Sequence, residues 1–212
     1  MPKFPEPPPV AELRRLPAAE KILDRGALLW RVYRRGGPHP TLWQMFRHFG
    51  PLNGRFDHHL PDDAGKPRIQ ERGIYYAAAD LATCLAEVFQ DTRAIHRNAA
   101  DQPWAVGFEL AAPVRLLDLT DTWPTRAGAS MALSSGPRPR ARRWSRAIYD
   151  AYPEIQGLYY PSSMHAHRPM ISLWERSREA LPEHPLFHRA LNDPALLVGL
   201  DRAATDIGYD LA

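Results

Sequence analysis

The chain has 212 residues, of which 44% are hydrophobic and 24% are charged, so it is long enough to bury one sizeable core. Its net charge of +3 and its pI of about 9.2 favour an anionic ligand without requiring nucleic acid. The single cysteine, Cys84, excludes a disulfide framework within the chain and favours a reducing compartment. No apolar run reaches the roughly 20 residues of a membrane span, and prolines stand where a signal peptide would have its apolar core. We therefore expect a soluble, cytoplasmic protein that does not associate with membranes.

The N-terminal part combines a proline-rich segment with one strong strand signal. Residues 1–10 are expected to be extended or disordered, and residues 11–26 to hold one or two short helical turns. Residues 27–34 (ALLWRVYR) are apolar, aromatic and β-branched, which predicts a strand. A helical turn is expected near residues 42–46, and the polar stretch 58–71 is expected to be a surface loop.

Residues 73–89 (GIYYAAADLATCLAEVF) contain the clearest pattern in the chain. The apolar and aromatic run at 73–78 predicts a strand. Asp80 then offers an N-cap oxygen, and the apolar residues that follow at helical spacing predict an amphipathic helix. Glu87 lies at the edge of the apolar stripe, beside Cys84. We expect this strand and this helix to line a common cleft.

Beyond residue 89, short strands and helices follow one another irregularly. Strands are expected at WAVGFELAA, VRLLDLT, GLYYPSSM and PMISLWE, and helices at ARRWSRAIYDA and near residues 195–206. Residues 121–140 are rich in Ser, Gly and Pro and predict an irregular excursion. This order favours a single α+β domain over a doubly wound sheet.

Two arginines are candidates for binding an anion. Arg31 interrupts an apolar strand, and its guanidinium could bind a phosphate or a carboxylate. Strand alternation, however, places it opposite Trp30 and Val32, as for a solvated edge residue. Arg55 follows an Asn-Gly pair and is either an exposed turn residue or a clamp on a ligand that the glycine allows to approach.

Tyrosine, glutamate and serine side chains are further candidates. Tyr75 and Tyr76 must point to opposite faces of their strand, so one is expected in the core and the other could stack on a flat ligand ring. Glu87 is either a solvated helix residue or a cleft carboxylate that stabilises a developing positive charge. Ser162 and Ser163 lie in a turn after a strand, and their sequence lacks the G-x-S-x-G motif of hydrolases.

Metal and nucleotide motifs do not stand out. The pairs His58-His59 and His165-x-His167 have no third ligand at a recognisable spacing, and there is no P-loop or G-x-G-x-x-G. The arginine-rich segment 138–146 (RPRARRWSR) could bind nucleic acid, but it has few aromatic side chains. Direct nucleic-acid binding is therefore not expected.

The order of these motifs resembles the RES domain family, named for its Arg, Glu and Ser, whose members are the toxin partners of Xre-type antitoxins. The motifs LWRVYR, NGRFD, GIYYAAADLATCLAEVF, LLDLT, GLYYPSSM and ISLWE occur in the family's order over residues 27–176. The resemblance implies an ADP-ribosyltransferase-like fold with the RES domain at 27–178. Residues 1–26 would form an N-terminal extension, and residues 179–212 a C-terminal helical extension packed on the domain.

Matched position by position, the resemblance implies a site for NAD+. The family's strand and turn arginines match Arg31 and Arg55. Its tyrosine, eleven residues before its glutamate, matches Tyr76 when that glutamate is Glu87, and its serine matches Ser162. The resemblance thus implies catalytic roles for Glu87, Arg31 and Tyr76, and NAD+ binding by Arg31, Arg55, Tyr76 and Ser162.

Two details of this match leave alternatives open. Ser163 is the alternative to Ser162 if the register shifts by one residue. The family's turn is commonly Gly-Gly-Arg, and here Asn53 takes the place of the first glycine. Because Asn tolerates a left-handed conformation, the turn can be kept.

The activity implied by the resemblance is cleavage of the nicotinamide–ribose bond of NAD+ by hydrolysis or phosphorolysis, as the toxin of a type II toxin–antitoxin system. Arginines would clamp the pyrophosphate, a tyrosine would stack on the cationic nicotinamide ring, and Glu87 would stabilise an oxocarbenium-like ribose. Ser162 would bond the ribose or the nicotinamide amide.

In this interpretation NAD+ is a substrate, no metal is expected, and the partner is an Xre-type helix-turn-helix antitoxin. Alternatives are transfer of ADP-ribose to a cellular protein, a ribonuclease-type toxin and a non-catalytic interaction domain. Whether the chain forms a homo-oligomer stays open.

Overall fold

The computed structural model describes residues 4–165 and 167–212. Within these residues nine strands form one sheet in the order β1-β7-β8-β9-β4-β2-β6-β10, with β3 added to β4. The strands are β1 Glu20–Leu23, β2 Leu28–Arg34, β3 Arg47–Gly50, β4 Arg68–Ala78, β6 Pro103–Glu109, β7 Val114–Asp118, β8 Gly157–Pro161, β9 Pro169–Trp174 and β10 Phe187–Ala190, while β5 Ala94–Ile95 and β11 Asp210–Leu211 form a separate pair. The helices are α1 Val10–Leu13, α2 Leu81–Val88, α3 Trp123–Arg126, α4 Ala132–Ser135, α5 Arg138–Ala151 and α6 Leu197–Ile207, with 3-10 turns η1 Glu175–Ala180 and η2 Pro194–Leu196. The predicted α+β class is confirmed.

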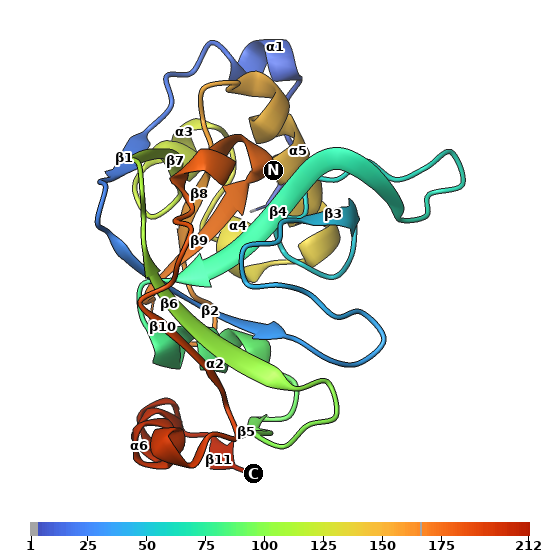
Figure 1. The fold of residues 1–212 in the computed structure, drawn as a ribbon. Helices are drawn as coiled ribbons and strands as arrows, with labels where there is room; N and C mark the ends of the chain where they lie inside the picture. The colour runs from blue at the N-terminus through green and yellow to red at the C-terminus, as the bar shows by residue number, and fades with distance from the viewer. Residues whose placement is uncertain (1–3, 166) are drawn as a thin grey trace.

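The large sheet separates two hydrophobic clusters because successive side chains of a strand point to opposite faces. In β2, Val32 joins one cluster and Tyr33 the other. The first cluster includes Leu85 of α2 and Trp144 of α5, and the second includes Tyr75. The long strand β4 crosses the middle of the molecule, with α1, α3 and α5 above it and α2 and α6 below it in the view of Figure 1. Both faces of β4 are packed over residues 73–78, whereas residues 68–72 are exposed or half-buried.

The strand–helix unit formed by β4 and α2 has the predicted character. Asp80 caps α2, since its Oδ1 accepts the backbone N–H of Thr83 at 2.8 Å. Cys84 and Leu85 are buried on the side of α2 that faces the core. Glu87 follows one turn after Thr83, near the C-terminal end of the helix, where it is only half-buried.

The N-terminal segment takes one of its two predicted forms over residues 4–9. Phe4 is buried, the Pro5 carbonyl accepts the indole N–H of Trp144 at 2.9 Å, and Glu6 pairs with Arg143 at 2.6 Å. These contacts fix an extended segment against α5, so the structure has the extended alternative and not the disordered one for this part. The part of that expectation that concerns residues 1–3 lies outside the described residues.

Two predicted elements change their extent, and a third is found where it was predicted. β4 begins at Arg68, so residues 68–71 belong to a strand and not to a loop. Residues 42–46 form a single turn, closed by the hydrogen bond from Met45 N to Leu42 O, and no helix. The helix predicted near residues 195–206 is confirmed as α6.

The predicted boundaries between extensions and domain do not divide the sheet. Strand β1, from the expected N-terminal extension, pairs with β7, and β10, from the expected C-terminal helical extension, pairs with β6. Backbone hydrogen bonding thus ties both ends of the chain to the same sheet. None of the helices in residues 4–165 and 167–212 is long and apolar enough to cross a membrane.

Candidate active site

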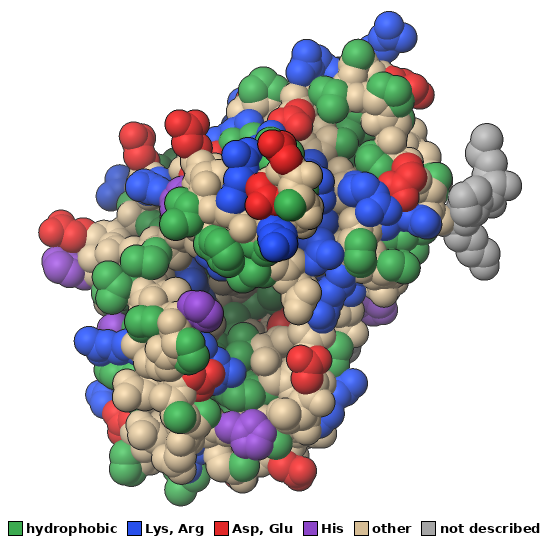
Figure 2. Space-filling view, turned by 90° about the vertical axis from the view of Figure 1, so that its right-hand side faces the viewer, with side chains coloured by type: hydrophobic (Ala, Val, Ile, Leu, Met, Phe, Trp, Pro, Cys, Tyr) green, Lys and Arg blue, Asp and Glu red, His purple; other side chains and the backbone are tan. Residues whose placement is uncertain are grey.

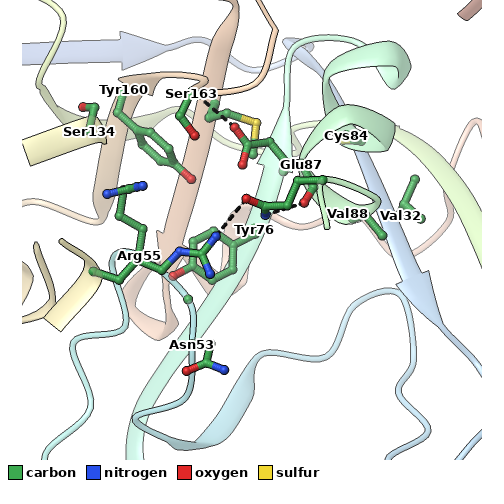
Figure 3. Close-up of a pocket in the computed structure, with 15 residues that line it drawn as sticks. Val32, Asn53, Arg55, Tyr76, Cys84, Glu87, Val88, Ser134, Tyr160 and Ser163 are labelled. Atoms are coloured by element: carbon green, nitrogen blue, oxygen red, sulfur yellow. Dashed lines mark hydrogen bonds between the residues drawn. The ribbon is translucent and has the colours of Figure 1, made fainter. Parts of the chain in front are cut away.

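A pocket of about 320 Å³ opens where β4, α2, the turn before Phe56, the loop after β8, and α4 and α5 meet. Its volume falls in the range of about 300–1,000 Å³ that small-molecule sites commonly have. The residues that line it include Asn53, Gly54, Arg55, Tyr76, Glu87, Gln90, Ser134, Arg138, Tyr160 and Ser163. Figure 3 shows Arg55, Tyr76, Glu87 and Tyr160 around this space. The face of the molecule in Figure 2 is hollowed near its centre, with Lys and Arg side chains gathered above the hollow.

The carboxylate of Glu87 is held by the loop that follows β8. Ser162 donates its hydroxyl to Oε1 at 2.6 Å, and the backbone N–H of Ser163 donates to the same oxygen at 3.1 Å. The described residues record no hydrogen bond to the other oxygen, Oε2. One carboxylate oxygen is therefore anchored to the protein, and the other is available to a ligand.

The hydroxyl of Ser162 has no hydrogen-bonding capacity left for a substrate. Its oxygen accepts the N–H groups of Met164 and His165, each at 3.0 Å, while its proton goes to Glu87. A hydroxyl offers one donor and two acceptor lone pairs, and all three are used. Ser162 is also only 4% exposed. This geometry favours a positioning role over the expected direct contact with ribose or nicotinamide.

Tyr76 presents its ring to the pocket while its hydroxyl is fixed behind it. The hydroxyl donates to Oδ1 of Asp57 at 3.0 Å and accepts the N–H of Phe56 at 3.2 Å. Burial and the nearby Asp57 carboxylate raise the pKa of Tyr76 well above its usual value. As expected, the neighbouring Tyr75 points to the other face of the sheet and is fully buried.

The turn that carries Arg55 is organised by the buried carboxylate of Asp57. Asp57 Oδ2 accepts the N–H of Leu52 at 2.7 Å, and Oδ1 pairs with Arg47 at 2.5 Å. A Cβ on Gly54 would lie 2.3 Å from Asp57 Oδ1 and 2.6 Å from the Tyr76 hydroxyl, so only glycine fits. Neither Asn53 nor Gly54 has a positive φ, so the turn does not use a left-handed backbone. The glycine is required because a side chain at this position would collide with Asp57 and Tyr76.

Two arginines give the pocket its positive charge. Arg55 donates to the Gly136 carbonyl at 2.6 Å, and Arg138 donates to the Gln90 side chain at 2.8 Å. Burial, followed by repulsion from Arg138, lowers the pKa of Arg55. Gln90 in turn donates to the backbone carbonyl of Glu87 at 2.7 Å. Arg138 is therefore connected through Gln90 to the backbone of Glu87, and Arg55 lines the same pocket.

Arg31 does not join this group, and the expectation that it converges with Arg55, Tyr76 and Glu87 in one cleft is wrong. It lies on the opposite face of the sheet, where its guanidinium stacks 4.0 Å from the centre of the Tyr75 ring and donates to the Met45 carbonyl at 3.2 Å. Strand alternation is the cause, because Val32 next to it takes the face that lines the pocket.

Arg138 supplies the second cation that the sequence interpretation placed at Arg31. The sequence did contain a signal, the arginine concentration at 138–146, but that pattern also fits a solvated basic helix. Ser134 was missed because residues 121–140 have no periodicity that would place them at a pocket. Tyr160 belongs to the YYPSS segment and faces the pocket from β8; burial, then Glu87, raises its pKa well above the usual value.

Histidine does not contribute to the pocket lining. His58 and His59 are fully buried outside the lining, and burial lowers the pKa of both. Within residues 4–165 and 167–212, no group of three or more His, Cys, Asp or Glu side chains is placed to hold a metal ion.

Comparison with known proteins agrees with the order of motifs in the sequence. The family model of the RES domain matches residues 28–192. No curated protein matches the chain. Among solved structures, the fold is similar to a chain in the crystal structure of the M. tuberculosis MbcT–MbcA toxin–antitoxin complex, with a TM-score of 0.58 and 14% sequence identity, over 91% of this chain and 97% of that chain. Because the family model covers most of its length, this chain belongs to the RES domain family.

Proposed function

We propose that this protein cleaves the nicotinamide–ribose bond of NAD+ in the pocket between β4 and α2. The observation that carries the proposal is the anchored carboxylate of Glu87, which faces a space bounded by Arg55, Arg138 and the Tyr76 ring. NAD+ combines an anionic pyrophosphate with a flat cationic ring, and the pocket offers partners for both.

The two arginines are suited to the pyrophosphate because a guanidinium binds phosphate oxygens through paired N–H groups. Arg55 and Arg138 each already donate one hydrogen bond to the protein, which holds them in place before substrate arrives. The ring of Tyr76, with its hydroxyl tied to Asp57, is suited to stack on the nicotinamide. A substrate bound this way has its reactive ribose near Glu87.

Glu87 would act on the ribose as its bond to nicotinamide breaks. The electron pair of the C1′–N bond leaves with nicotinamide, which becomes neutral, and positive charge develops on the ribose. An anchored carboxylate stabilises that charge, or orients the ribose through a hydroxyl, without having to reorganise. In hydrolysis, water then forms the new C1′–O bond and loses a proton; in phosphorolysis, a phosphate oxygen forms it. No step requires a metal.

Arg31 has no part in this proposal, since it lies on the other face of the sheet. Transfer of ADP-ribose to a protein uses the same bond cleavage and differs only in the acceptor, so it remains the alternative within the same chemistry. Nucleic-acid cleavage is less well supported, because three arginines of α5 are engaged by the protein: Arg140 and Arg143 both pair with Glu6, and Arg142 donates to the Leu52 carbonyl.

The protein would act as the toxin of a type II toxin–antitoxin system in the cytoplasm, where its single cysteine stays reduced. Support comes from membership of the RES family and from the fold shared with a chain of a toxin–antitoxin complex. We infer an Xre-type helix-turn-helix antitoxin as its partner.

The test is to incubate the purified protein with NAD+, with and without inorganic phosphate, and to follow free nicotinamide and the ribose product. Release of nicotinamide by the wild type and its loss in Glu87→Gln would support the proposal. If the wild type leaves NAD+ intact under both conditions, the proposal fails. Labelled NAD+ added to a cell extract distinguishes transfer to a protein from release of free product.

A further inference from the structure

His165 connects the loop that anchors Glu87 to the helix that carries Glu87. Its ring Nδ1 lies 2.8 Å from the hydroxyl of Thr83, which is fully buried in the first turn of α2. Its backbone N–H donates to the hydroxyl of Ser162 at 3.0 Å. His165 thus contacts both segments that the Ser162–Glu87 hydrogen bond joins, the loop through Ser162 and α2 through Thr83. It does not itself line the pocket.

The protons of this network can be assigned from the donors and acceptors. Both oxygens of the Asp80 carboxylate lie close to the Thr83 hydroxyl, at 2.8 and 2.9 Å, and a carboxylate only accepts. The single Thr83 proton therefore goes to Asp80. The Nδ1 of His165 must then carry a proton of its own and donate it to the Thr83 oxygen.

The second ring nitrogen of His165 is held much less firmly. Its Nε2 lies 3.9 Å from the carboxylate of Asp206 on α6, whose side chain is 70% exposed. The strong contact of the ring is therefore the one through Nδ1, and it pins the loop to the start of α2. The loop is pinned in the position from which Ser162 and Ser163 both reach Oε1 of Glu87.

We propose that His165 is a positioning residue, which fixes the Ser162–Ser163 loop on α2 through its Nδ1–H and thereby orients the Glu87 carboxylate. The proposal rests on the proposed function for its effect on catalysis, but the contact itself is independent of the reaction. Misplacing a catalytic group by a fraction of an ångström lowers the chemical rate, whereas substrate binding by Arg55 and Arg138 is untouched.

The side chains of Asn and Asp give a matched pair of variants. The amide nitrogen of Asn can take the place of Nδ1 and donate to Thr83, so His165→Asn keeps the contact. Asp has the same shape but no proton to donate, and its charge would face Asp80. We expect kcat of His165→Asn within about threefold of wild type, and kcat of His165→Asp and His165→Ala roughly 10- to 100-fold lower, with KM for NAD+ unchanged in all three.

Variants of Thr83 and Asp206 complete the test. Thr83→Val removes the acceptor and should lower kcat as His165→Ala does, and the double variant should be no worse than either single one because both remove the same contact. Asp206→Asn should leave kcat unchanged, since that carboxylate is not part of the proposed contact. Equal kcat in His165→Asp and His165→Asn, or additive effects of the Thr83 and His165 variants, would overturn the proposal.

Amide hydrogen exchange gives a readout that does not depend on activity. The N–H of Met164 donates to the Ser162 hydroxyl, so it should exchange slowly in the wild type and in His165→Asn, and faster in His165→Asp. If the wild type does not cleave NAD+ but the exchange follows this order, the proposed function fails and the positioning role stands. If exchange at Met164 is the same in all variants, the positioning role fails whatever the enzyme does.

Discussion

The hydroxyl of Ser162 donates a 2.6 Å hydrogen bond to Oε1 of Glu87, and so joins the loop after β8 to the end of α2 across 75 residues of sequence. A hydrogen bond to an ionised acceptor is about twice as strong as one between neutral groups. The bond sets the direction in which the second carboxylate oxygen of Glu87 points into the pocket.

Replacing Glu87 by Gln should abolish most of the NAD+ cleavage and leave substrate binding intact. Gln has the shape of Glu, and its carbonyl oxygen can still accept from Ser162, but it cannot stabilise a positive ribose. We expect kcat to fall by about 10²- to 10³-fold, the cost of removing one electrostatic group from an active site. Nicotinamide release measures kcat, and calorimetric titration measures the Kd of NAD+. A kcat within fivefold of wild type would remove Glu87 from the mechanism.

Ser162→Ala should lower kcat by less than Glu87→Gln does. The variant removes the donor to Glu87 and also leaves the N–H groups of Met164 and His165 without their acceptor. A lost hydrogen bond to a charged group costs about 1.5–3 kcal/mol, which corresponds to roughly a 10- to 150-fold lower kcat. Ser163→Ala is the matched control, because Ser163 contacts Glu87 through its backbone N–H, which the substitution keeps.

Asp57 should be needed for the stability of the turn that carries Arg55. Asp57→Ala leaves the half-buried guanidinium of Arg47 without its carboxylate and the N–H of Leu52 without its acceptor, so we expect the free energy of unfolding to fall by about 3 kcal/mol. Urea unfolding followed by fluorescence measures it. Asp63→Ala, at an exposed position, should change it by less than about 0.5 kcal/mol. Equal effects of the two substitutions would contradict the role assigned to Asp57.

His59 should make the protein less stable in mild acid. Burial, followed by the positive charge of Arg47, lowers the pKa of His59 to about 4 in the folded state, against 6.5 in the unfolded chain. His58 lowers this pKa further, whereas the Asp57 carboxylate raises it. The unfolded chain therefore binds the proton more readily as the pH falls from 6.5 towards 4, and stability is lost over that range. The loss attributable to His59 between pH 7 and pH 5 is about 2 kcal/mol.

The measurement is urea unfolding at pH 7 and pH 5 for the wild type and for His59→Gln. The variant cannot take up the proton, so its stability should depend less steeply on pH, whatever its stability at pH 7. His184→Gln is the control, because His184 has an exposed side chain and should leave the slope unchanged. A slope in His59→Gln equal to that of the wild type would exclude His59 as the source.

Phe4 lies outside residues 28–192, which match the family model, but should nevertheless affect substrate binding. A Cβ on Gly136 would lie 3.0 Å from its buried ring, and the Gly136 carbonyl holds Arg55. Phe4→Ala leaves a void behind that carbonyl, so Arg55 should be held less firmly and KM for NAD+ should rise severalfold while kcat changes little. Leu197→Ala, at an exposed position on α6, is the control. An unchanged KM would show that this segment only stabilises the fold.

The local patterns in the sequence determined most of the elements around the site. The strand–helix unit at β4 and α2, the Asp80 cap and the opposite directions of Tyr75 and Tyr76 follow from spacing and side-chain chemistry, which act between near neighbours. The order of motifs was specific enough to identify the family.

Contacts between distant segments could not be deduced in this way. The pairing of Ser162 with Glu87, the place of Arg138 in the pocket wall and the packing of Phe4 behind that wall depend on how four separate segments pack. No local preference encodes such contacts, because they form only when the sheet and its helices are assembled.

The position of Arg31 shows what strand alternation and the match to the family can each predict. Strand alternation predicted its face correctly, on the side opposite Val32, whereas the match to the family placed it in the cleft. The sequence by itself determined most of the elements around the site, the family and the opposite faces of neighbouring strand residues, since these depend on period and order along the chain. Only the tertiary structure decided which side chains share the pocket, because that depends on which faces of distant elements meet.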